Sequence, residues 1–449
     1  MRRNISLYVL ALFAGSWGLA PSATALPSYA RQTGLPCSGC HTTPPELNAS
    51  GRLFKLLAYA DRSENSITAP SDNRHTGMNL LEFLPLSAFL ETSLTSTKVP
   101  QPTTQNWNFE FPQDIALYLA GAWASHLGSF VQVTYKMQND HFSIDNTDIR
   151  YANKTQVSGK ELIYGLTLNN NPTVEDLWNS TPAWSFPFIA PDSVPTPTAA
   201  PVINGLLGLD VAGLGAYTMW DQHLYFAGTL YRSDHIGDTQ PTTGQCCSYN
   251  IRGVAPYWRL AWQQNGRTAN LEVGAYGIHM KSTPGAITGL ENSYTDWGPD
   301  IQYDRTLGKD VLSLRGTYVR QNSALVASAS PPSPANPTAE PGPHHLNASN
   351  ANVEYHLGNR YSGTFGWFMT DGTTDILLYP QNALTGSANG SPRSAGFMAN
   401  VSYWPIQNLD LAVQYTDYTR FNGAAINYDG AGRSASDNNT VYILARFLF

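Results

Sequence analysis

The sequence predicts an all-β fold: an outer-membrane antiparallel β-barrel of about 16 strands, preceded by a short N-terminal segment. Three observations predict it. From about Asn79 onward, stretches of strand length alternate apolar and polar residues. Tight turns and long connections follow one another in strict alternation, as expected when one barrel rim faces the periplasm and the other the outside. The chain also ends on an aromatic residue, Phe449, in an alternating stretch.

The first 25 residues have the pattern of an export signal. Arg2 and Arg3 precede an apolar run from Ile5 to Ala20, and residues 21–25 end in an A-x-A cleavage pattern. We predict cleavage after Ala25. The alternative, an uncleaved inner-membrane anchor, is disfavoured by the small and polar residues that close the run. The mature chain is therefore expected outside the cytoplasm.

A C-x-x-C-H motif follows closely: Cys37 and Cys40 flank two small residues, and His41 comes next. This spacing is the attachment pattern of c-type haem. Each thiol can form a thioether to a haem vinyl group, and the histidine is placed to ligate the iron. A redox pair or half of a zinc site is the alternative, but Cys246 and Cys247 are adjacent and cannot supply a second spaced pair. We predict one covalently bound haem c.

The haem segment, residues 26–78, is too short to bury a core of its own. We therefore expect it to fold as a plug inside a barrel formed by residues 79–449. His75 and Met78 lie between the motif and the first strand, so either is a candidate second axial ligand. A ligand from the barrel wall is the alternative. A Met ligand raises the reduction potential of the haem relative to a His ligand. If the electron donor is a weak reductant, a high haem potential is needed, and Met78 is then favoured.

Composition fits this architecture. The 449 residues are 42% hydrophobic and 13% charged, with a formal net charge of −7, and the 12% aromatic content argues against disorder. Abundant Tyr, Trp and Gly suit a barrel with aromatic girdles. After the signal, no apolar run reaches the roughly 18 residues that a spanning helix needs. The acidic balance provides no basic stripe, so nucleic acid is not an expected partner.

Individual strands show one apolar and one polar face. Residues 409–416 place Leu, Leu, Val and Tyr on one face and Asp, Ala, Gln and Thr on the other, and residues 131–137 and 270–276 behave alike. A soluble sandwich would share this alternation. An apolar C-terminal edge strand over residues 441–449 would, however, be an aggregation hazard in a soluble protein.

The connections separate the two folds better. Tight turns are predicted near residues 125–128, 155–160, 220–222, 265–267, 307–309, 358–360 and 406–408. Longer connections are predicted at residues 99–106, 171–204, 233–249, 282–292, 322–344, 371–391 and 421–439. The connection near residues 138–141 is the one exception: it lies on the rim of the long connections but is itself short. Both ends of such a barrel are expected in the periplasm.

The haem segment resembles that of the fused outer-membrane monohaem cytochrome c–porins of iron-oxidising bacteria, the outer-membrane iron oxidase family. The shared stretch runs from Tyr29 to His41 and continues through residues 45–48, Gly51, Phe54 and Tyr59. Ala58 stands where relatives are expected to have Gly. Beyond residue 59 the resemblance is one of architecture.

The resemblance implies an iron oxidase. Extracellular Fe(II) would donate an electron to the haem, with His41 as its ligand, and a periplasmic cytochrome c or copper protein would accept it. Oxidation outside the cell keeps insoluble ferric iron out of the periplasm. Two other functions stay open: a substrate-selective porin whose haem segment gates or senses redox state, and a haem enzyme acting on a small molecule.

Several inward-facing residues are further candidates. Four cations are expected either to pair haem propionates or to line a hydrated lumen: Lys136, Arg259, Arg315 and Arg446. Glu272 and Asp410 could attract ferrous iron, a hard cation, although solvated lumen carboxylates are commoner.

Two loops carry residues with separate roles. Cys246 and Cys247 are expected to form a vicinal disulfide that clips a loop outside the cytoplasm. His344 and His345 follow the Pro-rich residues 331–343 and are either a surface metal site or part of an extended loop.

Overall fold

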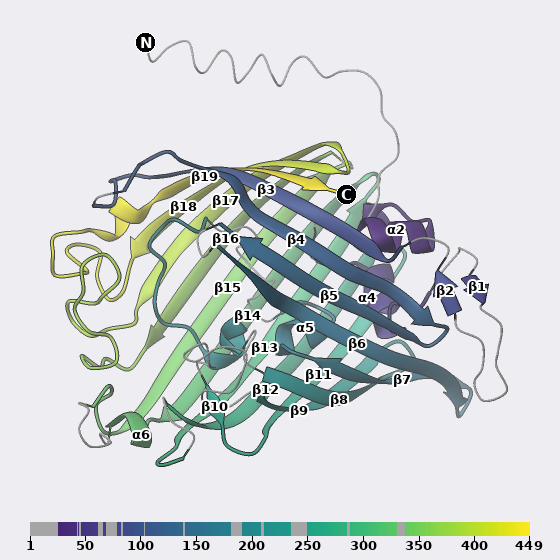
Figure 1. Ribbon diagram of the computed structural model, residues 1–449, viewed down its shortest axis with the longest axis horizontal. Coiled ribbons are helices and arrows are strands. Elements are labelled where there is room, and N and C mark those ends of the chain that lie inside the picture. Colours follow the sequence, from purple (N-terminus) through teal and green to yellow (C-terminus); the bar gives the residue numbers. More distant parts are fainter. Residues whose placement is uncertain are drawn as a thin grey trace, which may run out of the picture.

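The computed structural model describes residues 26–42, 44, 46–61, 66–68, 79–81, 84–102, 104–137, 140–180, 191–207, 211–234, 249–284, 288–329, 337–358 and 360–449. Most of them form one closed antiparallel β-barrel of sixteen strands (Figure 1). This confirms the predicted fold class and is the porin-like architecture of outer-membrane β-barrels.

The barrel strands follow one another in chain order around the wall. They are β3 (Leu86–Thr97), β4 (Asn108–Ala124), β5 (Leu127–Lys136), β6 (His141–Val157), β7 (Lys160–Asn169), β8 (Val211–Trp220), β9 (Leu224–Ser233), β11 (Ala255–Asn265), β12 (Ala269–Thr283), β13 (Asn292–Leu307), β14 (Asp310–Ala324), β15 (Pro343–Leu357), β16 (Tyr361–Gly372), β17 (Ser394–Ile406), β18 (Leu409–Arg420) and β19 (Thr440–Leu448). The wall closes because β19 pairs with β3. The short β10 (Asn250–Ile251) pairs with β12 beside β11.

All seven predicted tight turns join consecutive strands at one end of the barrel, here called the turn end. The longer connections lie at the other end, the loop end, and the connection between β5 and β6 is the short one predicted there. The first residue of β3 and the last of β19 both belong to the turn end. Chain direction and connection length therefore distinguish the turn end from the loop end.

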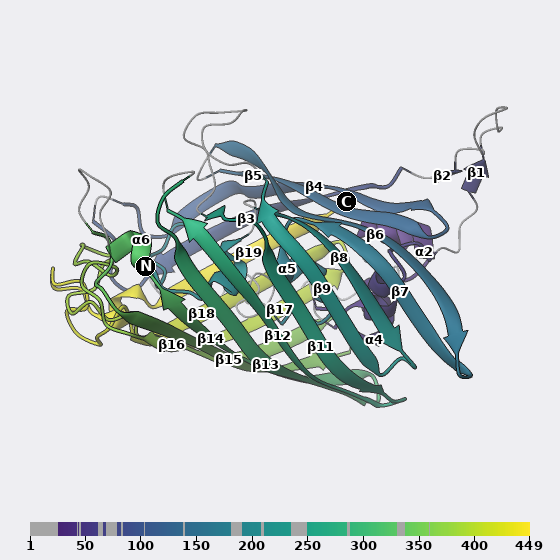
Figure 2. The same cartoon turned by 90° about the horizontal axis from the view of Figure 1, so that it is seen from below.

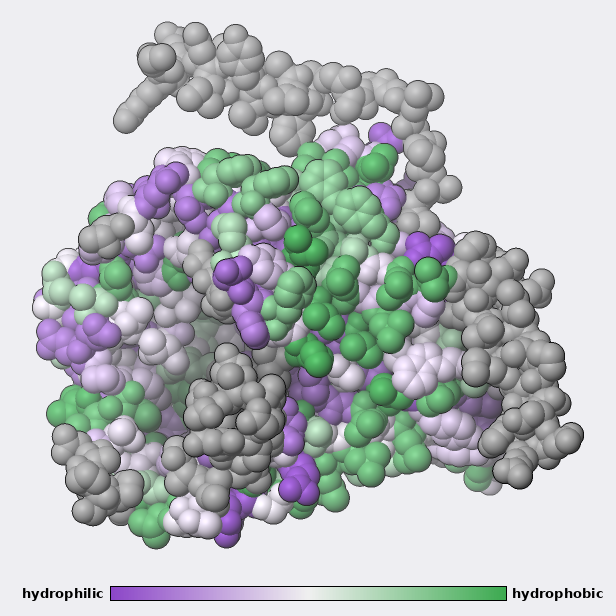
Figure 3. Space-filling model, in the orientation of Figure 1, coloured by the Kyte–Doolittle hydropathy of each residue, from purple (hydrophilic) through white to green (hydrophobic). Residues whose placement is uncertain are grey.

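The outer face of the wall is apolar and the inner face is polar. Along β18, Val413 is 47% exposed, whereas its neighbours Ala412 and Gln414 are buried. The same pattern recurs in other strands, whose exposed apolar residues include Leu166, Leu214, Phe226, Leu260, Phe365 and Val401. Hydrophobic residues gather over the strands on the outer surface (Figure 3). A wall of this kind suits a lipid environment.

The N-terminal segment forms three short helices: α2 (Pro27–Thr33), α3 (Cys37–Cys40) and α4 (Ala49–Leu56). Two further strands, β1 (Ser66–Thr68) and β2 (Asn79–Leu81), pair only with each other, so the barrel wall begins at Leu86 rather than at about residue 79. None of the helices in the described ranges is long and apolar enough to cross a membrane.

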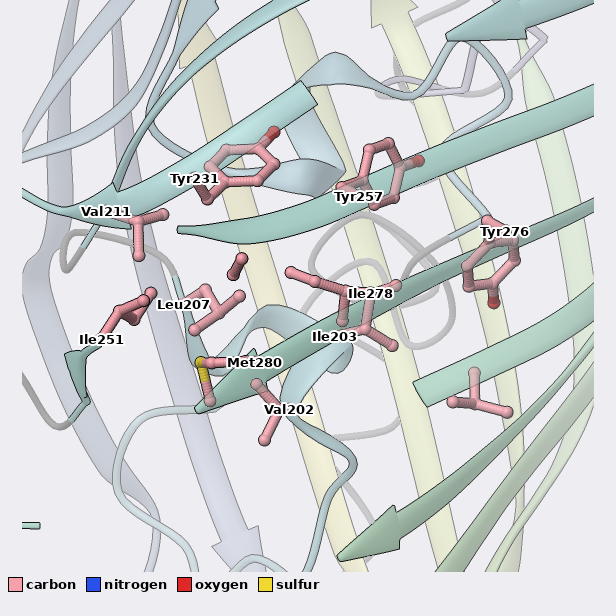
Figure 4. Packing of buried hydrophobic residues seen from close by; sticks show 12 residues of the cluster. Val202, Ile203, Leu207, Val211, Tyr231, Ile251, Tyr257, Tyr276, Ile278 and Met280 are labelled. Carbon is pink, nitrogen blue, oxygen red and sulfur yellow. The ribbon is translucent and has the colours of Figure 1, made fainter. Parts of the chain in front are cut away.

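The long connection between β7 and β8 folds into the lumen. It carries α5 (Pro172–Glu175) and a π-helix, η1 (Val202–Leu206). Figure 2 shows α5 enclosed by the strands. Val202, Ile203 and Leu207 pack against Tyr231, Tyr257, Tyr276, Ile278 and Met280 of the wall (Figure 4). Two other small helices, α6 (Val326–Ala329) and η2 (Ala435–Asn438), lie in connections at the loop end.

Candidate haem site

The haem motif forms one helical turn. The N–H of His41 donates to the carbonyl of Cys37 at 2.9 Å, which closes α3 and places both cysteines on the same turn. The backbone N–H of Cys37 donates to Oε1 of Gln407, in the turn between β17 and β18, at 3.1 Å. Burial raises the pKa of the Cys37 thiol to about 12 and also raises that of Cys40.

A backbone hydrogen bond orients the His41 ring. Nδ1 lies 3.0 Å from the carbonyl oxygen of Glu46, an atom that can only accept, so Nδ1 carries the proton. Nε2, on the opposite side of the ring, is then the nitrogen with a lone pair for a metal. A metal-ligating histidine is usually held in one tautomer by such a hydrogen bond from its other ring nitrogen.

Helix α4 packs directly against the haem turn. Asn48 caps it by accepting from the N–H of Gly51 at 3.0 Å, and its Nδ2 donates to the carbonyl of Ser38 at 3.1 Å. A Cβ on Gly51 would lie 2.1 Å from the carbonyl oxygen of Cys40, so only glycine permits this approach. The Asn and Gly of the shared sequence pattern thus hold α4 against the two cysteines.

An aromatic cluster continues from α4. The ring of Phe54 meets Tyr29 edge-on at 4.9 Å, and Tyr29 stacks on Tyr59 at 5.5 Å. Ala58 has φ +60°, in the left-handed region that favours glycine. This explains why relatives are expected to have Gly there, and it marks Ala58 as a strained position in this chain.

Residues 26–42 and 46–61 of the haem segment lie within the barrel at the turn end, opposite α6 in Figure 1. Its contacts run around the circumference: Ser28 with Ser87 of β3, Tyr29 with Ser129 of β5, Tyr59 with Asp148 of β6, Leu56 with Tyr217 of β8, Arg52 with Asn265 at the end of β11, Thr42 with Arg315 of β14, and Cys37 with Gln407 after β17. These contacts join residues of the haem segment to strands on several sides of the barrel. Predicted ligands His75 and Met78 lie outside the described residues.

Arg315 is the inward cation that lies beside the haem turn. It donates to Thr42 Oγ1 at 3.0 Å, forms an ion pair with Glu46, and lies 3.5 Å from Asp304. Two buried guanidinium nitrogens here, Nε of Arg315 and Nε of Arg52, have no hydrogen-bond acceptor among the described residues. Together with the Cys–Cys–His donor set, these orphaned donors fit a group that carries carboxylates, as haem does.

The other predicted inward cations are placed elsewhere. Lys136 ends β5 at the loop end, opposite Asp114. Arg446 forms an ion pair with Glu91 and lies across from Asp410 on the neighbouring strand. Arg446 therefore already has a carboxylate partner, and Asp410 lies beside a cation.

Arg259 is also neutralised, by a group of carboxylates in the lumen. Its guanidinium lies 3.3 Å from Asp176, 3.0 Å from Glu272 and in a two-pronged contact with Asp300 at 2.5 and 2.7 Å. Glu272, a candidate for attracting ferrous iron, is therefore engaged with Arg259.

The inward connection carries residues that sequence analysis did not single out. Nζ of Lys55, on α4, donates to the carbonyl of Asp176 at 2.9 Å, so the connection touches the haem segment. Trp178 is 2% exposed and meets Tyr225 edge-on at 5.2 Å. The signal was present: Val174, Leu177 and Trp178 are unusually apolar for a loop that faces water.

Two predictions for the loops remain: a surface metal site that includes His344, and a disulfide between Cys246 and Cys247. Nδ1 of His344 lies 3.0 Å from the Gly342 carbonyl and Nε2 lies 2.8 Å from Asp375, so both ring nitrogens are occupied and His344 is not a surface metal ligand. No group of three potential metal-ligating side chains occurs within the described ranges. Cys246, Cys247 and the export signal lie outside those ranges.

Comparison with known proteins finds likeness of fold. No family model matches, and no curated protein matches. Among solved structures, Salmonella typhi OmpF in complex with daunomycin is 11% identical, with a TM-score of 0.46 over 86% of this chain and 100% of that one. The channel DcaP of Acinetobacter baumannii is 11% identical with a TM-score of 0.46, over 85% and 100%. An anion-selective porin from Comamonas acidovorans is 11% identical with a TM-score of 0.46, over 81% and 98%.

Proposed function

We propose that the protein carries electrons across the outer membrane: an electron from extracellular ferrous iron reaches a single covalent haem c and leaves to a periplasmic cytochrome c or copper protein. The observation that carries the proposal is the Cys37–Cys40–His41 turn, with His41 oriented for ligation, inside a segment that hydrogen-bonds to strands around the barrel. Ferrous iron as donor is what the family resemblance implies.

Each residue of the turn has a defined task in this proposal. The thiols of Cys37 and Cys40 would hold the haem covalently, and His41 would ligate its iron while the Glu46 carbonyl keeps the ring in one tautomer. Arg52 and Arg315 would donate to the propionates. When bound, the haem supplies a one-electron redox centre.

The proposal assigns the turn end to the periplasm. In outer-membrane barrels the short turns and both chain ends lie on the periplasmic side, and the predicted export signal precedes the haem segment. The haem would then be attached near the periplasmic rim, and the inward connection with Trp178 would approach it from the extracellular side.

A second candidate is a substrate-selective porin whose haem segment gates or senses redox state. The porin-like barrel, with its polar inner wall and inward-folded connection, favours it. The packing of residues 26–61 around the circumference of the turn end favours a closed lumen instead. Planar-bilayer conductance separates the two, because a porin conducts ions and a sealed conduit does not.

The direct test mixes purified, oxidised protein with ferrous iron anaerobically over a range of pH and follows the haem absorption bands. Reduction of the haem supports the proposal. Absence of reduction at every pH, under conditions where dithionite reduces the same sample, would contradict it. Carbon monoxide binding to the reduced protein tests the third possibility, a haem enzyme, since it needs an open iron position.

A further inference from the structure

Charge is distributed unevenly around the turns that frame the haem segment. Four exposed cations lie in or beside the turn-end connections that follow β11, β13 and β15: Arg267, Arg305, Lys309 and Arg360. We call them the cationic arc. One carboxylate, Asp310, lies among them, and it accepts from Tyr355 and the N–H of Gly358 rather than from a cation.

On the opposite side of the rim, the lysines beside the turn between β6 and β7 have carboxylate partners. Lys154 lies 3.9 Å from Glu161, and Lys160 lies 2.5 Å from Asp221. Within the described residues the arc cations form no such ion pair. The unneutralised positive charge thus lies on the side of the rim that holds the haem turn, through Arg315 of β14 and Gln407 after β17.

We propose that the cationic arc is the docking surface for an electron carrier with an acidic face. This rests on the proposed function and specifies the chemistry of its periplasmic partner. Redox encounters use small, transient interfaces, so long-range charge attraction contributes to their rates more than buried area does. A surface of one sign beside the redox centre raises the rate of productive encounter by about 10- to 1,000-fold at low ionic strength.

Membrane phospholipid is the other class of molecule that exposed cations at a rim could bind. Lipid headgroups surround the whole rim, so lipid-binding cations would be expected on both sides. The ion-paired lysines opposite, and the gathering of four cations without an ion pair on the haem side, favour a protein partner.

The test measures second-order rate constants of electron exchange between the full-length holoprotein and two probes, acidic plastocyanin and basic mitochondrial cytochrome c, against ionic strength. With plastocyanin the rate should fall as salt rises. The variant Arg267→Gln/Arg305→Gln/Lys309→Gln/Arg360→Gln should lose about tenfold or more of the low-salt rate and most of its salt dependence. Cytochrome c should show the opposite salt dependence with the wild type.

Two double variants that remove the same charge at different places on the rim separate the effect of position from the effect of net charge. Lys309→Gln/Arg360→Gln should slow exchange with plastocyanin, whereas Lys154→Gln/Lys160→Gln should leave the exchange rate within about twofold, because it removes the same charge on the side of the rim away from the arc. Equal effects of the two pairs, or no effect of the quadruple variant, would overturn the proposal. Weakened binding to phosphatidylglycerol vesicles with unchanged exchange rates would assign the arc to lipid and overturn it too.

Dithionite-reduced or ferricyanide-oxidised protein serves in all exchange experiments, so docking is measured independently of ferrous iron. If ferrous iron reduces the haem of the variants and docking fails, the proposed function stands without the arc. If ferrous iron does not reduce the haem while salt-dependent docking persists, the donor assignment fails and the arc remains.

Discussion

At the scale of single residues, His41 carries the haem hypothesis. Its Nδ1 contact with the Glu46 carbonyl at 3.0 Å leaves Nε2 as the ligating atom. His41→Ala should keep the covalent attachment through the cysteines but lose the normal low-spin absorption spectrum and the reduction by ferrous iron. His223 makes a similar Nδ1 contact with the Gln263 carbonyl at 2.9 Å, outside any haem motif, so His223→Ala is the matched control and should retain both. A normal spectrum in His41→Ala would remove His41 as the ligand.

Gly51 is the second residue with a sharp prediction. Because an added Cβ would lie 2.1 Å from the Cys40 carbonyl, Gly51→Ala must move α4 off the haem turn, at about 1–3 kcal/mol. The haem content per protein, measured as the pyridine haemochrome, should drop. Gly363→Ala in β16, where a Cβ meets no atom within 4 Å, should have full haem content. Equal haem loading of both variants would contradict the packing described.

At the scale of elements, α4 is joined to the inward connection by Lys55. Burial lowers the pKa of Lys55 to about 7, against about 10.4 in an unfolded chain. Between these values the unfolded chain binds more protons, so stability rises with pH from about 7 to about 10 and is level below that window. Lys55→Met should abolish the rise, worth on the order of 1–4 kcal/mol. Urea unfolding in detergent at pH 7 and pH 10 measures this difference in unfolding free energy. Lys154 is an exposed lysine, so Lys154→Met is the control and should keep the rise.

The loop end has its own pH-dependent contact, between His344 and Asp375. Burial opposes ionisation of Asp375, but hydrogen bonds from the N–H groups of Leu378 and Glu340 and from His344 lower its pKa below the usual value. A lowered carboxyl pKa means that this contact contributes stability above pH about 3.9 and loses it as the pH falls through the lower folded value. Asp375→Asn should therefore speed proteolysis of the loop-end connections at pH 5, while wild type keeps its protection there. Identical cleavage rates would contradict a stabilising contact.

Sequence patterns determined most elements of the barrel and few of its contacts. Alternation and turn spacing predicted the strands, the turns and the side on which Arg259 and Glu272 lie, because a period of two and a closed wall leave no other orientation. Patterns could not show that residues 172–180 fold inward to meet Lys55, since that depends on partners far apart in the chain. The Asn48–Gly51 spacing is visible in the sequence, but its reason, the close approach of Gly51 to Cys40, is a tertiary contact.

At the scale of the whole molecule, two elements occupy the lumen: residues 26–61 at the turn end and the inward connection that meets them at Asp176. We expect no steady ion conductance from the wild-type protein in planar bilayers. Deleting residues 26–61 should produce conductance, since the contacts around the circumference are then lost. Wild-type conductance equal to that of the deletion variant would mean that the segment does not seal the barrel.

The central claim is transfer of electrons across the membrane through a single haem. Proteoliposomes that contain the protein with its loop end outward, and an impermeant oxidant such as ferricyanide inside, test it when ferrous iron is added outside. We expect the trapped oxidant to be reduced at a rate proportional to haem content, and to stay oxidised in His41→Ala vesicles. Reduction at the same rate in His41→Ala vesicles, or no reduction with fully haem-loaded wild type, would contradict it.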